Sequence, residues 1–257
     1  MSQTMRMLQI ARVDLSYFFR TKWLLATLIG LNVTDMLVVG IVYKGMMSID
    51  YFQFFAPGVI ITGLFFASFD VGRRVHLGLT EGVSQYYLTL PVSLNGLVVA
   101  HLLSAGLGGV IYAGILAIVG SVLIPQLASL NTLILLPYMF MLSMGLAGIA
   151  AALNLLSSAG ERYWVFAEGV QTALVSLSTI AYPIGVVSAF LPTYVVSMIE
   201  LNPLSQGAEA LRAVVNGLPS ADAFNLVALT GTSLALMAVG VVSYRRVFTH
   251  LREVGKI

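Results

Sequence analysis

The side chains that carry out chemistry in enzymes are few in this sequence and stand far apart. The chain has no cysteine, which excludes disulfides, thiol catalysis and thiolate metal sites. It has only three histidines: His76, His101 and His250. No HExxH or GxSxG motif occurs, and no lysine follows a glycine and precedes Ser or Thr, as a phosphate-binding loop requires. We therefore expect no catalytic residue, no metal ligand set and no cofactor bound by this chain.

One carboxylate stands out by its place, because Asp35 lies near the middle of the first long apolar run, close to Asn32 and Thr34. If this run crosses a membrane, an ionised carboxylate there costs about 2.5–3.5 kcal/mol on insertion scales, so it must face protein or a cavity. Two interpretations stay open. Asp35 lines a transport pathway, or it is protonated or paired within the bundle. We expect His101 to be packed or hydrogen-bonded rather than catalytic.

The composition is that of a membrane protein. Hydrophobic residues make up 58% of the 257 residues and charged residues only 9%, whereas a soluble domain is about 25% charged. Too few charges remain to cover a surface that faces water. The net charge of +2 gives no reason to expect a nucleic-acid partner. We expect one all-α polytopic transmembrane domain over residues 1–257, with membrane lipid around most of it.

Apolar runs long enough to cross a hydrocarbon core of about 30 Å recur along the chain. Five are clear: Trp23–Tyr43, Phe52–Val71, Leu97–Leu123, Leu133–Leu156 and Phe224–Tyr244. A further run, Trp164–Ile199, is interrupted by Pro183 and Pro192 and is too short for two spans and a turn. We interpret it as one span followed by a short broken hairpin, because proline breaks helices. The total is six transmembrane helices.

The basic residues support six crossings and orient them. On this topology all but two of the 13 Lys and Arg lie on one side, the exceptions being Lys44 and Arg212. The positive-inside rule then places both termini in the cytoplasm, in a cell (plasma or inner) membrane. A seventh span would put the basic C-terminal tail outside.

The first 22 residues are expected to form an N-terminal interfacial helix. On a helical wheel one face carries apolar side chains: Met7, Leu8, Ala11, Leu15, Phe18 and Phe19. Arg6, Arg12 and Arg20 lie on the other side, and Ile10 and Val13 are exceptions. This pattern is typical of a helix in the headgroup region. The alternative is a simple positive flank of the first span.

A short polar helix is predicted just before the last apolar run. Asn202 suits an N-cap, Pro203 the first helical position and Gly217 a left-handed C-terminal cap. An apolar stripe runs between them through Leu204, Ala208, Leu211 and Val215. Glu209 and Arg212 are spaced to pair on another face. The pattern predicts an amphipathic helix on the outer side of the membrane.

These residues carry a resemblance to a known family. The Asn-Pro-Leu turn (Asn202, Pro203, Leu204) and the Glu-Ala-Leu-Arg run (Glu209, Ala210, Leu211, Arg212) before a final span resemble the signature of type-2 ATP-binding-cassette (ABC) transporter permeases. The resemblance covers nearly the whole chain. It implies an N-terminal interfacial helix, six spans, and re-entrant helices between spans five and six. Residues 181–217 correspond to that extracytoplasmic re-entrant and amphipathic region.

A second match lies in residues 72–93, between spans two and three. This loop resembles the family's cytoplasmic coupling helix in Glu81, Gly82, Leu88, Leu90, Pro91, Val92 and Ser93. The resemblance implies docking on an ATPase subunit, with contacts expected from Glu81, Val83, Tyr86, Tyr87, Leu90 and Pro91. The alternative is an ordinary interfacial loop helix whose tyrosines lie at the headgroups.

The resemblance implies a membrane permease subunit of an ABC exporter that is not itself an enzyme. Two copies, or this chain and a similar partner, would form the pathway, and separate ATPase subunits would bind ATP and Mg. A lipophilic drug or natural product is the expected cargo, and a polysaccharide or lipid-linked glycan is the alternative. A proton-coupled secondary transporter using Asp35 is an alternative of another class. A membrane-embedded enzyme is disfavoured by the missing catalytic motifs.

Overall fold

A computed structural model describes residues 3–44, 50–80, 89, 92–157, 160–216 and 223–254. Within these residues every regular element is a helix. In chain order they are α1 (Gln3–Arg20), α2 (Lys22–Thr34), η1 (Asp35–Val39), α3 (Gly40–Lys44), α4 (Tyr51–Thr80), α6 (Leu94–Gly120), η2 (Pro125–Ala128), η3 (Leu130–Leu135), α7 (Leu136–Ser157), α8 (Gly160–Ser176), α9 (Ile184–Val187), α10 (Thr193–Leu201), α11 (Pro203–Val215) and α12 (Ala223–Glu253).

Five stretches are long and apolar enough to cross a membrane. They are Leu25–Tyr43, Tyr51–Gly72, Leu94–Gly120, Leu130–Leu156 and Val227–Glu253, and each overlaps one of the five clear spans predicted above. The prediction of an all-α, multi-pass membrane protein is thereby confirmed. The sixth crossing stays a prediction: α8 has 17 residues, a length of about 26 Å at about 1.5 Å per residue.

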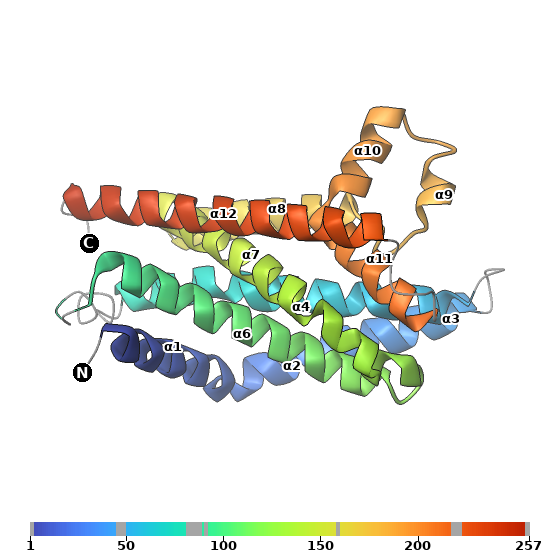
Figure 1. The fold of residues 1–257 in the computed structure, drawn as a ribbon, viewed down its shortest axis with the longest axis horizontal. Coiled ribbons are helices and arrows are strands. Elements are labelled where there is room, and N and C mark those ends of the chain that lie inside the picture. The colour runs from blue at the N-terminus through green and yellow to red at the C-terminus, as the bar shows by residue number, and fades with distance from the viewer. Residues whose placement is uncertain are drawn as a thin grey trace.

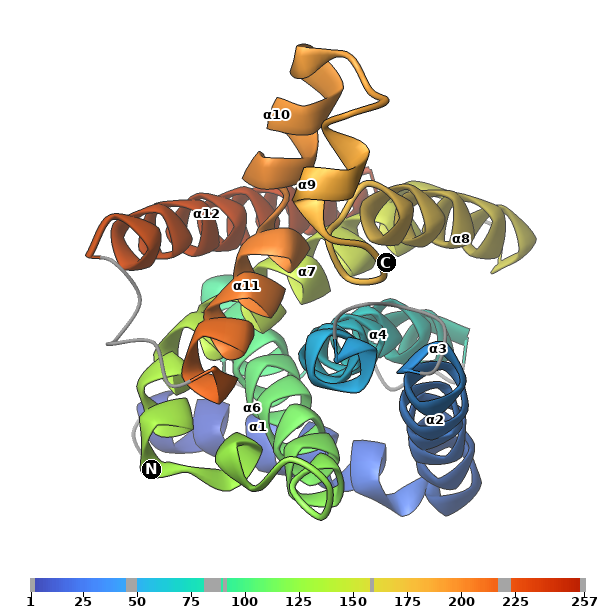
Figure 2. The same cartoon turned by 90° about the vertical axis from the view of Figure 1, so that its right-hand side faces the viewer.

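The long helices run side by side along the longest axis of the molecule, as Figure 1 shows. The start of α1 and the end of α12 lie at the same end of the bundle, and α9 and α10 project from the opposite end. In the end-on view of Figure 2, α2 and α8 lie at the edge with α4 between them. Burial agrees, because 78% of the apolar stretch of α4 is buried but only 17% of that of α2 and 22% of that of α12. The core therefore forms around α4, and α2 and α12 face outward.

Small residues bring the backbones of α7 and α12 into direct contact. A Cβ added to Gly148 would lie 2.4 Å from the carbonyl carbon of Gly240, and one added to Gly240 would lie 2.2 Å from the carbonyl oxygen of Gly145. Nearby, the hydroxyls of Ser68 on α4 and Ser143 on α7 share a buried hydrogen bond of 2.7 Å. The glycines of α7 and α12 thus form a packing seam between these two helices.

The N-terminal helix packs lengthwise on α6. Met7 lies beside Gly96, and Leu15 and Phe18 lie beside Gly108. Of the predicted apolar face, Leu8 is 59% exposed, whereas Ile10, an exception to that face, is buried. Contact with α6, rather than an ideal wheel, selects which side chains are covered. The location of α1 in the headgroup region stays a prediction.

The two prolines of the predicted broken hairpin act as helix starts. Pro183 is the N-cap residue of α9 and Pro192 that of α10, each with extended ψ (138° and 147°). Between Ser176 and Pro183 the chain has no regular helix. The interruption predicted in Trp164–Ile199 is therefore present. Whether α9 and α10 re-enter a membrane stays a prediction.

Candidate functional site

The helix α11 is anchored at its N-terminus by Asn202, as its sequence predicts. The Oδ1 atom of Asn202 accepts a hydrogen bond from the backbone N–H of Leu204 at 2.9 Å, and Pro203 occupies the first turn. The Nδ2 atom of the same side chain donates to the carbonyl oxygens of Leu174 (2.7 Å) and Leu177 (2.6 Å), where α8 ends. One amide therefore satisfies the start of α11 and the end of α8. The predicted cap at Gly217 lies outside the described residues.

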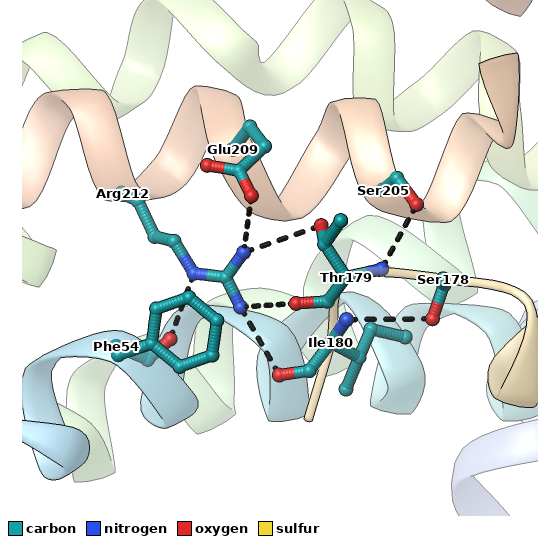
Figure 3. Close-up of polar contacts among 7 residues, drawn as sticks. All are labelled: Phe54, Ser178, Thr179, Ile180, Ser205, Glu209 and Arg212. Atoms are coloured by element: carbon teal, nitrogen blue, oxygen red, sulfur yellow. Dashed lines mark hydrogen bonds and ion pairs between the residues drawn. The ribbon is translucent and has the colours of Figure 1, made fainter. Parts of the chain in front are cut away.

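Arg212 is buried, with 5% of its surface exposed, and uses all five of its N–H donors (Figure 3). Its Nε atom donates to the carbonyl oxygen of Phe54 on α4 at 2.8 Å. Its Nη2 atom donates to the carbonyl oxygens of Thr179 (2.7 Å) and Ile180 (3.0 Å). Its Nη1 atom donates to Glu209 (2.7 Å) and to the Thr179 hydroxyl (3.3 Å). The guanidinium lies 3.7 Å from the ring centroid of Phe54.

The segment held by Arg212 is a buried piece of irregular backbone after α8. Ser205 on α11 accepts a hydrogen bond from the N–H of Thr179 (3.0 Å), and Tyr51 on α4 donates to the carbonyl oxygen of Ala181 (2.7 Å). Without regular secondary structure, these polar groups need side-chain partners. Burial lowers the pKa of Arg212, and the neighbouring Glu209 carboxylate opposes that shift. We call Asn202, Ser205, Glu209 and Arg212 the α11 clamp.

The buried side of α11 extends beyond the predicted apolar stripe. The apolar stripe Leu204, Ala208, Leu211 and Val215 is buried as predicted. Ser205 and Arg212, which are not part of this stripe, are also buried, and Ala210 is 8% exposed. The reason is that the carbonyl groups of the 179–180 backbone supply polar partners inside the protein. The spacing of Glu209 and Arg212 correctly predicted their pair but gave no sign of these backbone acceptors.

Asp35 lies at the start of η1, a π-helical turn in the first candidate span. Such turns occur frequently at functional sites. Its side chain is exposed, and in the described part of the chain it makes no hydrogen bond or ion pair. Asn32, three residues earlier, is buried and donates to the hydroxyl of Tyr112 at 3.1 Å. The two neighbouring polar groups therefore face different surroundings.

The outward face of α8 carries a second exposed carboxylate, Glu168. It forms a shallow groove of about 770 Å³ lined by Val165, Glu168, Gly169, Thr172, Ala173 and Ser176. Glu168 is the central residue of α8 and is exposed. The groove surface is mostly apolar, and Glu168 is the one charged side chain that lines it, a group that is costly to place in hydrocarbon.

The end of the bundle near both termini carries a connected layer of polar contacts. The Nδ1 atom of His101 on α6 lies 2.7 Å from the hydroxyl of Tyr244 on α12, and its Nε2 atom lies 3.5 Å from the carboxylate of Asp14 on α1. Arg74 on α4 pairs with Asp70 (3.5 Å) and donates to the carbonyl oxygen of Asp14 (3.1 Å). The expectation that His101 is hydrogen-bonded is confirmed. This layer ties four helices together.

Most of the predicted coupling segment lies outside the described residues, including Glu81, Val83, Tyr86, Tyr87, Leu90 and Pro91. The end of the segment is described: Ser93 caps α6 by accepting from the N–H of Gly96 (3.2 Å), and Gln3 of α1 donates to the Ser93 hydroxyl (2.5 Å). The start of α1 thus contacts the point where this segment enters α6.

The described residues contain no cluster of His, Asp or Glu that could hold a metal ion. The whole sequence matches no protein-family model and none of the curated proteins.

Proposed function

We propose that this chain is the membrane-spanning permease subunit of an ATP-driven type-2 ABC exporter. The observation that carries the proposal is a pair of outward-facing carboxylates, Asp35 in the first candidate span and Glu168 in the middle of α8. Neither suits lipid, because a carboxylate in hydrocarbon is costly. A pathway lined by protein and water, completed by a second copy of the chain or a similar subunit, would accommodate both.

The proposal includes the topology. With α8 as the fifth of six crossings, both termini are cytoplasmic, as the positive-inside rule favours, and α9 and α10 are re-entrant helices on the outer side. The common end of α1 and α12 in Figure 1 is consistent with an even number of crossings. Cysteines placed at Ser129 and Asn216 should be labelled from outside intact cells, and one at Lys256 only after permeabilisation. Labelling of position 256 in intact cells would reject this topology.

ATP and Mg are assigned to separate ATPase subunits, which dock on residues 72–93. The double substitution Tyr86→Ala with Tyr87→Ala should weaken co-purification of the ATPase, since truncating a buried interface aromatic costs about 2 kcal/mol or more. Membrane insertion should stay normal because no span is altered. Glu209→Ala is the matched control. Glu209 lies on α11, on the predicted outer side of the membrane, so this change should leave ATPase binding unchanged. Wild-type ATPase binding and export in the tyrosine variant would remove the coupling role.

The cargo proposed is a lipophilic drug or natural product, and a polysaccharide or lipid-linked glycan is the alternative. Phe and Met side chains are frequent in the spans and charges are few, which suits a lipophilic molecule. Export assays with both cargo classes in the same cells distinguish them.

A proton-coupled secondary transporter is the second candidate, favoured by the exposed carboxylate of Asp35. Reconstituted vesicles separate the two mechanisms. ATP-dependent transport that requires the ATPase subunits supports the exporter. Transport driven by a pH gradient without any ATPase, and lost in Asp35→Asn, would replace it.

A further inference from the structure

The outward face of α12 changes character along its length. From Gly231 to Val242 its exposed positions are apolar or small: Gly231, Leu234, Ala235, Ala238, Val239 and Val242. The next exposed positions on this face are Arg245 and Arg246, followed by His250. An apolar surface of about three helical turns therefore ends abruptly at two adjacent arginines.

A groove lies at this transition. It has a volume of about 470 Å³ and is lined by Val242, Arg245, Arg246, Thr249, His250 and Glu253. Two guanidinium groups, an imidazole and a hydroxyl give it many hydrogen-bond donors. The single carboxylate, Glu253, lies at the far end of the helix. Charge therefore favours an anion in the half of the groove next to the apolar stripe.

Neighbouring residues indicate at which level of the membrane the groove lies. Tyr244, the residue before Arg245, is buried and contacts His101, which in turn contacts Asp14. Arg74 and Asp70 pair in the same layer. Charged residues gathered at one level across α1, α4, α6 and α12 are expected where spans leave the hydrocarbon. Arg245 and Arg246 thus lie at the boundary between membrane and water.

From this arrangement we infer that the α12 groove is a binding site for one anionic phospholipid. The acyl chains lie along the stripe from Leu234 to Val242, and the phosphate accepts hydrogen bonds from Arg245 and Arg246, since guanidinium groups bind phosphate through paired N–H donors. Thr249 and His250 offer further donors to the headgroup. The inference does not rest on the proposed transport function, because it uses only the helix face and its depth.

The test compares two variants that lose the same charge at the same end of the bundle. Arg245→Gln with Arg246→Gln removes the groove donors. Arg12→Gln with Arg20→Gln removes two exposed arginines of α1 and leaves the groove intact. The full chain is purified into mixed micelles that contain equimolar phosphatidylglycerol and phosphatidylcholine with identical acyl chains. Native mass spectrometry then counts the lipids retained on each protein.

The wild-type chain and the α1 variant should retain phosphatidylglycerol in preference to phosphatidylcholine, and the groove variant should lose about tenfold or more of that preference. Equal retention by the groove variant overturns the inference. So does an equal loss in the α1 variant, because that would reflect overall charge rather than a site. Gel filtration of all three proteins verifies that each is folded.

A second measurement separates a lipid from a free phosphate or a protein partner. Phosphatidylglycerol should raise the thermal stability of the wild-type chain and not that of the groove variant, whereas inorganic phosphate or glycerol phosphate should have no such effect, because neither fills the apolar stripe. Stabilisation by either soluble anion to the same extent would overturn the lipid assignment. Loss of ATPase co-purification in the groove variant, with lipid retention unchanged, would identify this face as a protein contact instead.

Discussion

Arg212 and Glu168 are both charged side chains in an apolar chain, and the structure treats them in opposite ways. Arg212 is buried and makes five hydrogen bonds within its own chain. Glu168 is exposed on α8, and Asp35 is exposed on the first span. A charge whose partners all lie in the same chain serves the fold. An outward-facing carboxylate in an apolar chain is instead available to something outside the chain, which is the basis of the proposed pathway.

This contrast predicts which substitutions should change stability and which should change transport. Changes at the buried clamp residues Asn202 and Arg212 and in the glycine seam are expected to lower stability. Changes at the outward carboxylates are expected to leave stability alone and alter transport. The predictions below run from the largest expected effect on stability to the smallest.

Arg212→Met should destabilise the protein most, by about 3 kcal/mol or more, because it leaves three backbone carbonyl groups without their donor inside the protein. Thermal unfolding of the purified chain in detergent measures the loss. Arg212→Lys keeps the charge but has a single ammonium in place of the planar guanidinium. Its stability should lie between those of wild type and Arg212→Met. If Arg212→Met is as stable as wild type, the α11 clamp does not stabilise the fold, and the contrast between Arg212 and Glu168 is wrong.

Gly148→Ala should cost about 1–3 kcal/mol, because the added Cβ forces α7 away from the backbone of Gly240. Gly114→Ala on α6 is the matched control, since nothing lies within 4 Å of its added Cβ. That control should be neutral or stabilising by up to about 1 kcal/mol, the ordinary effect of removing glycine from a helix. The same unfolding assay compares the two, and equal effects would argue against a close α7–α12 seam.

Asn202→Ala should cost about 1–2 kcal/mol, the upper part of the usual range for an N-cap, because the side chain also binds the end of α8. Asn202→Asp separates the two roles, since it keeps the acceptor for Leu204 and loses the donors for Leu174 and Leu177. We expect its stability to lie between wild type and Ala. If Asp matches wild type, the link to α8 contributes nothing.

Asp35→Asn and Glu168→Gln should change the free energy of unfolding by less than about 0.5 kcal/mol, as exposed substitutions usually do. Export should nevertheless fall, because each change removes a charge from an outward surface assigned to the pathway. Transport assays at matched protein levels measure this. If both variants export normally, the outward carboxylates have no role in the pathway and the proposed function loses its main support.

The α11 region shows which contacts can be predicted from the local sequence pattern and which cannot. The N-cap at Asn202, the helix that follows Pro203, the apolar stripe and the Glu209–Arg212 pair all follow from spacing within one helix, because these are contacts between residues close in sequence. The burial of Arg212 and its hydrogen bonds to the backbone do not follow from spacing. Its acceptors are backbone oxygens of residues 54, 179 and 180, and hydrogen-bond acceptors of this kind exist at every position, so no sequence signal marks them.

The sequence by itself determined that this is an all-α membrane protein and where its five clear spans lie, since hydropathy acts residue by residue and helices satisfy their own backbone in lipid. Only the tertiary structure decided which side of each helix is covered. It placed Asn32 inside and Asp35 outside, buried Ile10 in place of Leu8, and joined α7 to α12 through glycines 145, 148 and 240. The physical reason is that apolar residues surround most of each membrane helix, so more than one face could be buried. The choice between lipid and protein is therefore made by the fit of neighbouring helices.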